Sequence, residues 1–169
     1  DIDLTLNFLK LINKKIPSSL TFINKYEKDY ISYHCSKHNI DASQIEIISL
    51  DHNQIQDKIN EFDFNIFFPK KGYYLKGFFP TKIAESLMSG IPIITTSINT
   101  EINNYIINQN IGMIIDHLNN DIINKIFKNI NFYMNKENKY NIREFAINNL
   151  SIKYAVSIYN MIYKNSLQK

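Results

Sequence analysis

The sequence is poor in the residues that build disulfide scaffolds, flexible linkers and membrane spans. Its 169 residues include one cysteine, no tryptophan, four glycines and four prolines. A single cysteine excludes an internal disulfide and indicates a reducing compartment. No run of about 18 apolar residues is present, which argues against a spanning helix, and the first residues lack the pattern of a secretory signal. We therefore expect a cytoplasmic protein.

What the sequence does contain is typical of one globular domain. Hydrophobic residues make up 44% and aromatic residues 13% of the chain, and a chain of this length buries one substantial core. The net charge is +3, but residues 122–169 hold eight lysines and arginines against Glu137 and Glu144. We interpret this basic region as a solvated helical face, with peripheral association with an anionic membrane as the alternative. Nucleic-acid binding is not expected.

Hydrophobic spacing divides the chain into alternating helices and strands. Apolar residues three and four apart predict helices, and short apolar or β-branched runs predict strands. The five expected strands cover residues 19–25, 44–50, 64–70, 91–96 and 112–116. Such alternation predicts an α/β fold with a Rossmann-like parallel sheet flanked by helices on both faces. Because the chain opens on a helix, we expect that the first strand of such a sheet is missing.

The first two expected helices allow more specific predictions. Asp3 is a candidate N-cap for the helix over residues 3–15. The helix over residues 26–39 is expected to turn an apolar arc toward the core. That arc would contain Tyr26, Tyr30, Tyr33 and Cys35.

The same second helix contains the only pattern that resembles a metal-binding motif. His34 and His38 are four residues apart, a spacing that can hold zinc. We expect no third and fourth ligands of the right kind nearby. We therefore interpret the two histidines as a helix surface, interpret the N-terminal DID triplet as a helix start, and expect no metal.

The clearest functional pattern is KGFFPTKIAESLMSGIPIITTS, residues 76–97. Proline is favoured at the first position of a helix, so Pro80 predicts a helix start directly after a strand and its loop. The free amides of Thr81 and Lys82 would form the positive end of that helix, where anions bind. Lys82 adds a charge, and Gly77 lets a ligand approach the backbone. These residues predict a phosphate site.

Glu85 is the unusual residue of this helix. A helical wheel places it beyond the edge of the buried arc, one turn inward from the anion site. The predicted buried arc is Ile83, Ala84, Leu87 and Met88. A carboxylate can accept two hydroxyl hydrogen bonds, as a ribose diol would supply. The alternative is that Glu85 only complements the helix dipole, which contributes about 0.3–1 kcal/mol.

Taken together, these features resemble the C-terminal, donor-binding domain of GT-B fold glycosyltransferases, in particular the retaining family 4 (group 1) enzymes. The resemblance is strongest over about residues 64–116. The matching positions are Pro80, Lys82, Glu85, Ser89-Gly90, Pro92, Glu101 and Asn110-Ile111-Gly112.

The resemblance implies that residues 1–149 form a nucleotide-sugar-binding domain and that residues 150–169 form a helix returning toward an N-terminal domain. Glu85 would bind the ribose of a UDP- or GDP-sugar, and the backbone around residues 79–82 would hold the diphosphate. The implied site is Gly77, Phe78, Phe79, Pro80, Thr81, Lys82 and Glu85. The implied activity is hexosyl transfer in bacterial polysaccharide biosynthesis, with no metal or other cofactor.

Two departures limit what the resemblance implies. Family members often carry a second glutamate eight positions before Glu85, where this chain has Gly77, so the sugar stays open. The acceptor-binding N-terminal domain is absent, so we expect this chain to bind a donor without efficient transfer and to expose Tyr154, Tyr159 and Tyr163. Two alternatives remain: a fragment of a GT-B-like sugar epimerase, and a non-catalytic Rossmann-like interaction module.

Overall fold

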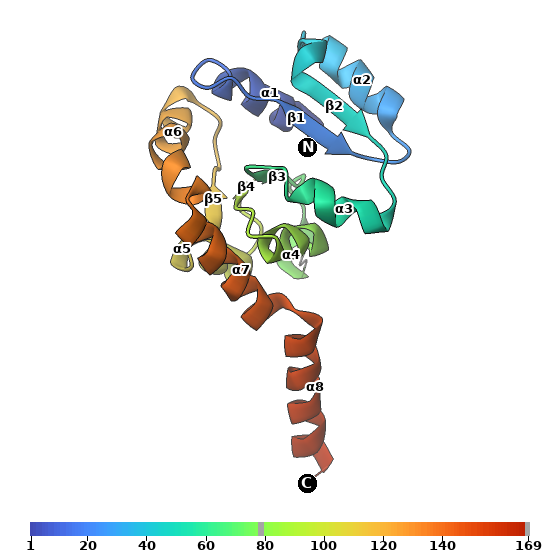
Figure 1. The fold of residues 1–169 in the computed structure, drawn as a ribbon, viewed down its shortest axis with the longest axis vertical. Helices are drawn as coiled ribbons and strands as arrows, with labels where there is room; N and C mark the ends of the chain where they lie inside the picture. The colour runs from blue at the N-terminus through green and yellow to red at the C-terminus, as the bar shows by residue number, and fades with distance from the viewer. Residues whose placement is uncertain (78–79, 168–169) are drawn as a thin grey trace.

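The structure is a computed structural model that describes residues 1–77 and 80–167. Within these residues helices and strands alternate as predicted (Figure 1). The strands are β1 (Leu20–Ile23), β2 (Ile45–Ile48), β3 (Asn65–Phe67), β4 (Ile93–Thr95) and β5 (Gly112–Ile114). The α-helices are α1 (Ile2–Ile12), α2 (Lys28–Lys37), α3 (His52–Ile59), α4 (Thr81–Met88), α5 (Thr100–Asn108), α6 (Asn120–Met134), α7 (Lys136–Leu150) and α8 (Ile152–Leu167). Two 3-10 turns, Ala42–Gln44 and Tyr73–Gly77, lie between them.

The strands form two parallel sheets, which corrects our expectation of a single sheet. β1 pairs with β2, and the second sheet has the order β3-β4-β5. Leu20 of β1 and Ile66 of β3 pack against the same hydrophobic core. In the described part of the chain the two sheets therefore meet through side chains and not through a shared hydrogen-bond ladder. The α/β class is confirmed, and the expected missing first strand stays a prediction.

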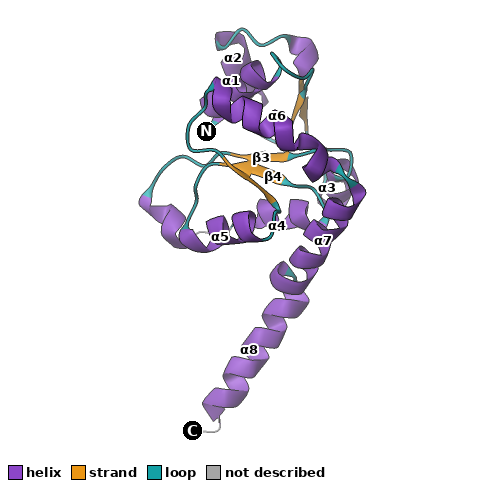
Figure 2. Cartoon of the chain, turned by 90° about the vertical axis from the view of Figure 1, so that its left-hand side faces the viewer, coloured by secondary structure: helices purple, strands orange, loops and turns teal. Residues whose placement is uncertain are grey.

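Helices cover both faces of the three-stranded sheet, as predicted. Successive residues of a strand point to opposite faces. On one face Ile93, which is 0% exposed, joins a core built by α4, α5 and α7. On the other face Ile94, which is 3% exposed, joins a core built by α1 and α6. Figure 2 shows α4 and α5 on one side of β3 and β4, with α1 and α6 on the other.

The two-stranded sheet has a smaller core. Each sheet with the helices packed on it is called a lobe here, and α1 belongs to both lobes. Leu6 of α1 meets Ile31 and Cys35 of α2 over β1 and β2. Phe8 and Leu9 of the same helix point into the core of the three-stranded sheet. α1 therefore contributes side chains to the cores of both lobes.

The predicted N-cap of α1 is wrong by two residues. Asp1 is the cap, since its side chain accepts a hydrogen bond from the amide of Leu4 at 3.1 Å. Asp3 lies in the first turn instead. This frees the Asp3 carboxylate to interact outside α1.

The predicted apolar arc of α2 is wrong for its three tyrosines. Tyr26, Tyr30 and Tyr33 are 86%, 48% and 65% exposed, whereas Ile31 and Cys35 are buried. α2 begins at Lys28, so Tyr26 precedes it. Ile31 and Cys35, four residues apart, pack with Leu6 of α1, and the tyrosine rings lie outside this core.

Residues in the left-handed region follow three helices: Asn39 after α2, Gly90 after α4 and Asn110 after α5. Gly90 follows α4 with φ of +73°, as expected for a residue that ends a helix, and a Cβ there would lie 2.7 Å from the Lys139 carbonyl oxygen. Asn110 follows α5 with φ of +52°.

A Cβ on Gly112 would lie 2.2 Å from the Ile93 carbonyl oxygen, so β5 can only lie against β4 with glycine at this position.

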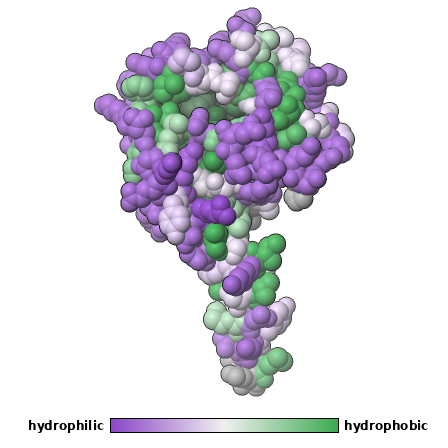
Figure 3. All heavy atoms as spheres, in the orientation of Figure 1, coloured by the Kyte–Doolittle hydropathy of each residue, from purple (hydrophilic) through white to green (hydrophobic). Residues whose placement is uncertain are grey.

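The last helix extends away from the rest of the chain (Figure 1). No residue of α8 is buried, and the expected exposure of its tyrosines is confirmed. In the space-filling view apolar side chains continue along this helix (Figure 3). Across the described ranges, none of the helices combines the length and hydropathy that a membrane crossing requires.

Candidate functional site

The candidate site lies where β3 leads through residues 68–80 into α4. All three strands of this sheet are parallel, so their carboxyl ends meet at one edge. The described residues that leave this edge are 68–77, which include a 3-10 turn, then 96–99 and 115–119. In α/β sheets this edge is where ligands bind.

α4 begins one residue later than predicted. Pro80 is its N-cap, with extended backbone (φ −73°, ψ 114°), and Thr81 is the first helical residue. Pro80 is buried, whereas Thr81 and Lys82 are exposed. Because the first amides of a helix have no intrahelical acceptor, the amides of Thr81 and Lys82 are still the positive end of α4. The predictions for Phe78 and Phe79 lie outside the described residues.

Glu85 is paired with Lys82 along the surface of α4. The Lys82 Nζ donates to both carboxylate oxygens, at 3.1 and 2.9 Å. The Glu85 side chain is 33% exposed and that of Lys82 is 63% exposed. The structure thus brings together two residues of the predicted site, in a pair that their i,i+3 spacing allows within one helix.

The buried side of α4 differs in part from the predicted arc. Ile83 and Leu87 are buried as predicted, but Ala84 and Met88 are only half-buried. Ser86 is buried and accepts a hydrogen bond from the Asn65 side chain of β3. This bond anchors α4 to the sheet, and sequence reasoning missed it because the partner is 21 residues away.

Polar side chains also join the neighbouring loops at the carboxyl edge. The Asp116 carboxylate, after β5, accepts from the Ser97 amide, after β4, at 3.2 Å. The Asn103 amide group donates to the Ser97 hydroxyl at 2.6 Å. Asn99 caps α5 and donates to the Leu75 carbonyl at 3.0 Å, which ties the loop after β4 to the loop after β3. Sequence reasoning missed Asp116, although its position directly after a strand is the pattern that could have indicated it.

The loop before α4 is held by its own aromatic residues. The Tyr74 hydroxyl donates to the Lys70 carbonyl at 2.8 Å, and the Lys76 ammonium lies 4.7 Å from the centre of the Tyr73 ring. Gly77 ends the 3-10 turn, and a Cβ there would have no atom of another described residue within 4 Å. Gly77 is therefore not required by packing, which leaves room beside the backbone.

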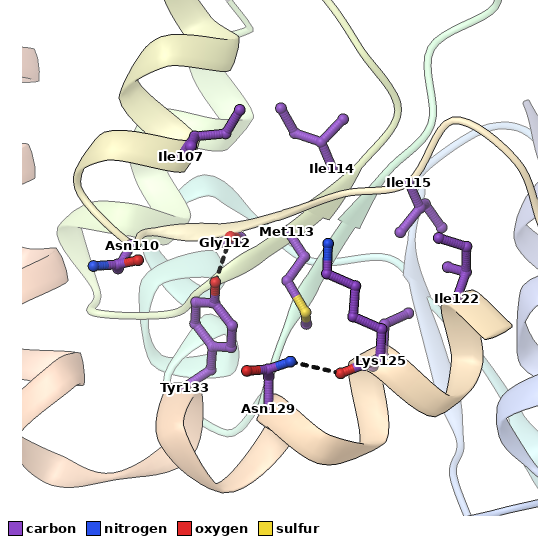
Figure 4. Close-up of a pocket in the computed structure, with 11 residues that line it drawn as sticks. Ile107, Asn110, Gly112, Met113, Ile114, Ile115, Ile122, Lys125, Asn129 and Tyr133 are labelled. Carbon is purple, nitrogen blue, oxygen red and sulfur yellow. Dashed lines mark hydrogen bonds between the residues drawn. The ribbon is translucent and has the colours of Figure 1, made fainter.

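A cavity of about 330 Å³ lies elsewhere, between the free edge of β5 and α6 (Figure 4). The Tyr133 hydroxyl donates to the Gly112 carbonyl at 2.7 Å across one end of it. Burial raises the pKa of Tyr133. None of the described residues of the predicted donor site lines this cavity.

Asp3, His34 and His38 form a cluster that sequence reasoning missed. His34 Nδ1 and His38 Nε2 lie 3.0 and 2.7 Å from the same oxygen of Asp3. The expectation that no further ligand lies near the two histidines is therefore wrong, because α1 carries Asp3 to them. Histidine and carboxylate are both ligands of divalent metals.

Searches of protein-family models and of curated proteins find no match to this chain.

Proposed function

We propose that this chain is the donor-binding domain of a glycosyltransferase and that it binds a UDP- or GDP-sugar at the start of α4. The observation that carries the proposal is the Lys82–Glu85 pair beside the free amides of α4, at the carboxyl edge of a parallel sheet. A cation, a helix N-terminus and a carboxylate within one turn provide complementary groups for a diphosphate and a ribose.

In this proposal the ion pair is the resting arrangement of the site. A diphosphate that binds accepts hydrogen bonds from the Lys82 ammonium and from the backbone amides of Thr81 and Lys82. Glu85 is then released to accept hydrogen bonds from the two ribose hydroxyls. Because both side chains are partly exposed, the surface ion pair that must be given up contributes only about 0.2–1 kcal/mol.

Transfer in this proposal requires a second domain that holds the acceptor. The exposed apolar residues of α8 support a role in contacting such a domain. Ile152 and Leu167, near the two ends of α8, are 84% and 87% exposed. Residues 1–169 alone are expected to bind the nucleotide and to show no efficient transfer. A peripheral membrane contact through the same basic, tyrosine-rich helix is the alternative role of α8.

Nucleotide binding can be measured by thermal unfolding of residues 1–169 with UDP or GDP. A ligand at 100 times its Kd stabilises its site by about 2.7 kcal/mol. For a chain of this size, this raises the Tm by roughly 5–10 °C. We expect Glu85→Gln to weaken binding about 10- to 100-fold, since hydrogen bonds to a charged group are lost.

The matched control is Glu61→Gln. Glu61 pairs with Lys58 at 2.8 Å with the same i,i+3 spacing, in the segment from α3 to the loop before β3. Each variant is expected to change the free energy of unfolding by no more than about 0.5 kcal/mol, but only Glu85→Gln should weaken nucleotide binding. If neither nucleotide raises the Tm of the unchanged chain, or if both variants bind alike, the proposal is wrong.

A non-catalytic interaction module is the second candidate, and α8 is the observation that favours it. No described residue of α8 is buried, and none belongs to the three hydrophobic cores. On this reading, removal of residues 152–167 would leave the Tm nearly unchanged, and no nucleotide would bind.

A further inference from the structure

We propose that Asp3, His34 and His38 bind one Zn²⁺ ion, which joins α1 to α2. This site is separate from the donor site and independent of the proposed function. The three residues come from the first turn of α1 and from the carboxyl end of α2. Two imidazoles and one carboxylate are a ligand set that zinc accepts.

The ligand atoms already converge on one point. His34 Nδ1 and His38 Nε2 lie 3.0 and 2.7 Å from one Asp3 oxygen, and the three ligand atoms lie within 4.8 Å of one another. In a tetrahedral site with bonds of about 2.0–2.1 Å, neighbouring ligand atoms are about 3.3 Å apart. Small movements of the three side chains would therefore admit the ion.

The surroundings orient the two imidazoles and leave an entry path. The side chains of His34 and His38 are only 12% and 15% exposed, whereas that of Asp3 is 51% exposed. The His34 ring packs against the ring of Tyr30, with centroids 4.5 Å apart. Lys10 of α1 donates to the His38 carbonyl at 2.8 Å, which fixes the end of α2 against α1. An ion can reach the cluster from the Asp3 side, where a water molecule would complete four ligands.

The cluster lies beside the smallest of the three hydrophobic cores in the described part of the chain. That core consists of the buried Leu6, Ile31 and Cys35, with six partly buried apolar side chains packed against it. Small cores are commonly reinforced by a metal or a disulfide, and Cys35 has no cysteine partner. A zinc ion across α1 and α2 would act as this reinforcement.

The test uses ZnCl₂ as the only added ligand, with residues 1–169 as the protein. Calorimetry is expected to show one ion per chain, and zinc at 100 times its Kd should raise the Tm by roughly 5–10 °C. MgCl₂ should show no such binding by calorimetry and should not raise the Tm, because Mg²⁺ prefers an all-oxygen octahedral site. Co²⁺ bound in the same place should show the visible absorption of tetrahedral cobalt.

Variants separate this site from other zinc ligands. His34→Gln with His38→Gln should lose at least the 10- to 100-fold that an outer partner alone contributes. His117→Gln, which changes an exposed histidine of the loop after β5, and Cys35→Ser should bind zinc as the unchanged chain does. Asp3→Asn provides the same test with both histidines retained, should the double variant fail to fold.

Two results would overturn the proposal. One is a chain that binds no zinc at one ion per molecule. The other is a folded double variant, or a folded Asp3→Asn, that keeps the affinity and the cobalt spectrum of the unchanged chain.

Discussion

The two parallel sheets of this chain differ in how completely they are enclosed. β4 has a strand on each side and a helical layer on each face, so all three of its residues are buried. Among the described strands β1 and β2 pair only with each other, and every residue of β1 is half-buried. The comparison teaches that an apolar run alone does not make a buried strand; neighbours on both edges are needed as well.

The comparison can be tested most strongly with the same substitution in each sheet. Ile93→Ala removes a side chain that is 0% exposed from the three-stranded sheet, and should lower the free energy of unfolding by about 3–5 kcal/mol. Ile47→Ala acts on the half-buried β2 and should cost only about 1–2 kcal/mol, because less surface is removed from water. Urea denaturation of both variants measures the difference. Equal losses would show that the two sheets are equally enclosed.

A second test compares two glycines at the three-stranded sheet. Gly112→Ala would force a Cβ to within 2.2 Å of the Ile93 carbonyl oxygen, and should cost about 1–3 kcal/mol or more through the displacement of β5. In the described part of the structure Gly77→Ala meets no atom within 4 Å, and it should leave the Tm unchanged while weakening nucleotide binding. A large loss of stability in Gly77→Ala would instead assign that glycine a structural role.

A smaller effect than that of Ile93→Ala is expected at the edge of β5 that does not pair with β4. Tyr133→Phe removes the hydrogen bond to the Gly112 carbonyl and should cost about 1–2 kcal/mol. Burial raises the pKa of Tyr133 above its usual 10.0, so the folded chain favours the neutral phenol. The stability that the neutral Tyr133 phenol contributes is therefore fully present well below pH 10. It is lost as the pH rises from the pKa of the unfolded chain through the raised pKa of the folded chain.

Ultraviolet absorbance of the phenolate, together with urea denaturation as a function of pH, measures this effect. The unchanged chain should lose more stability than Tyr133→Phe between neutral and strongly alkaline pH. Parallel pH curves for the two proteins would contradict the role of Tyr133.

Much of the local structure could be predicted because its causes are local. Each of the five strands lies within its expected range, and Gly90 ends α4 as its position after Ser89 indicated. The predicted arc of α2 failed because tyrosine is tolerated both inside and outside a core, and the side of α2 that is enclosed is set by residues of α1, β1 and β2. Ser86 was missed for the same reason: its partner, Asn65, is supplied by another element.

The candidate site and the histidine cluster show the same difference between local and distant causes. The Lys82–Glu85 pair could have been predicted from the sequence, since both residues lie on one helix at i,i+3. Asp3 could not be assigned to His34 and His38, which lie 31 and 35 residues further along the chain.

The sequence by itself determined the order of strands and helices and, to within one residue, where α4 begins, because hydrophobic period, proline and glycine act over a few residues. Only the tertiary structure decided that the strands divide into two sheets and that α1 delivers Asp3 to α2. Those outcomes depend on which distant side chains pack together, a property that no short stretch of the chain contains.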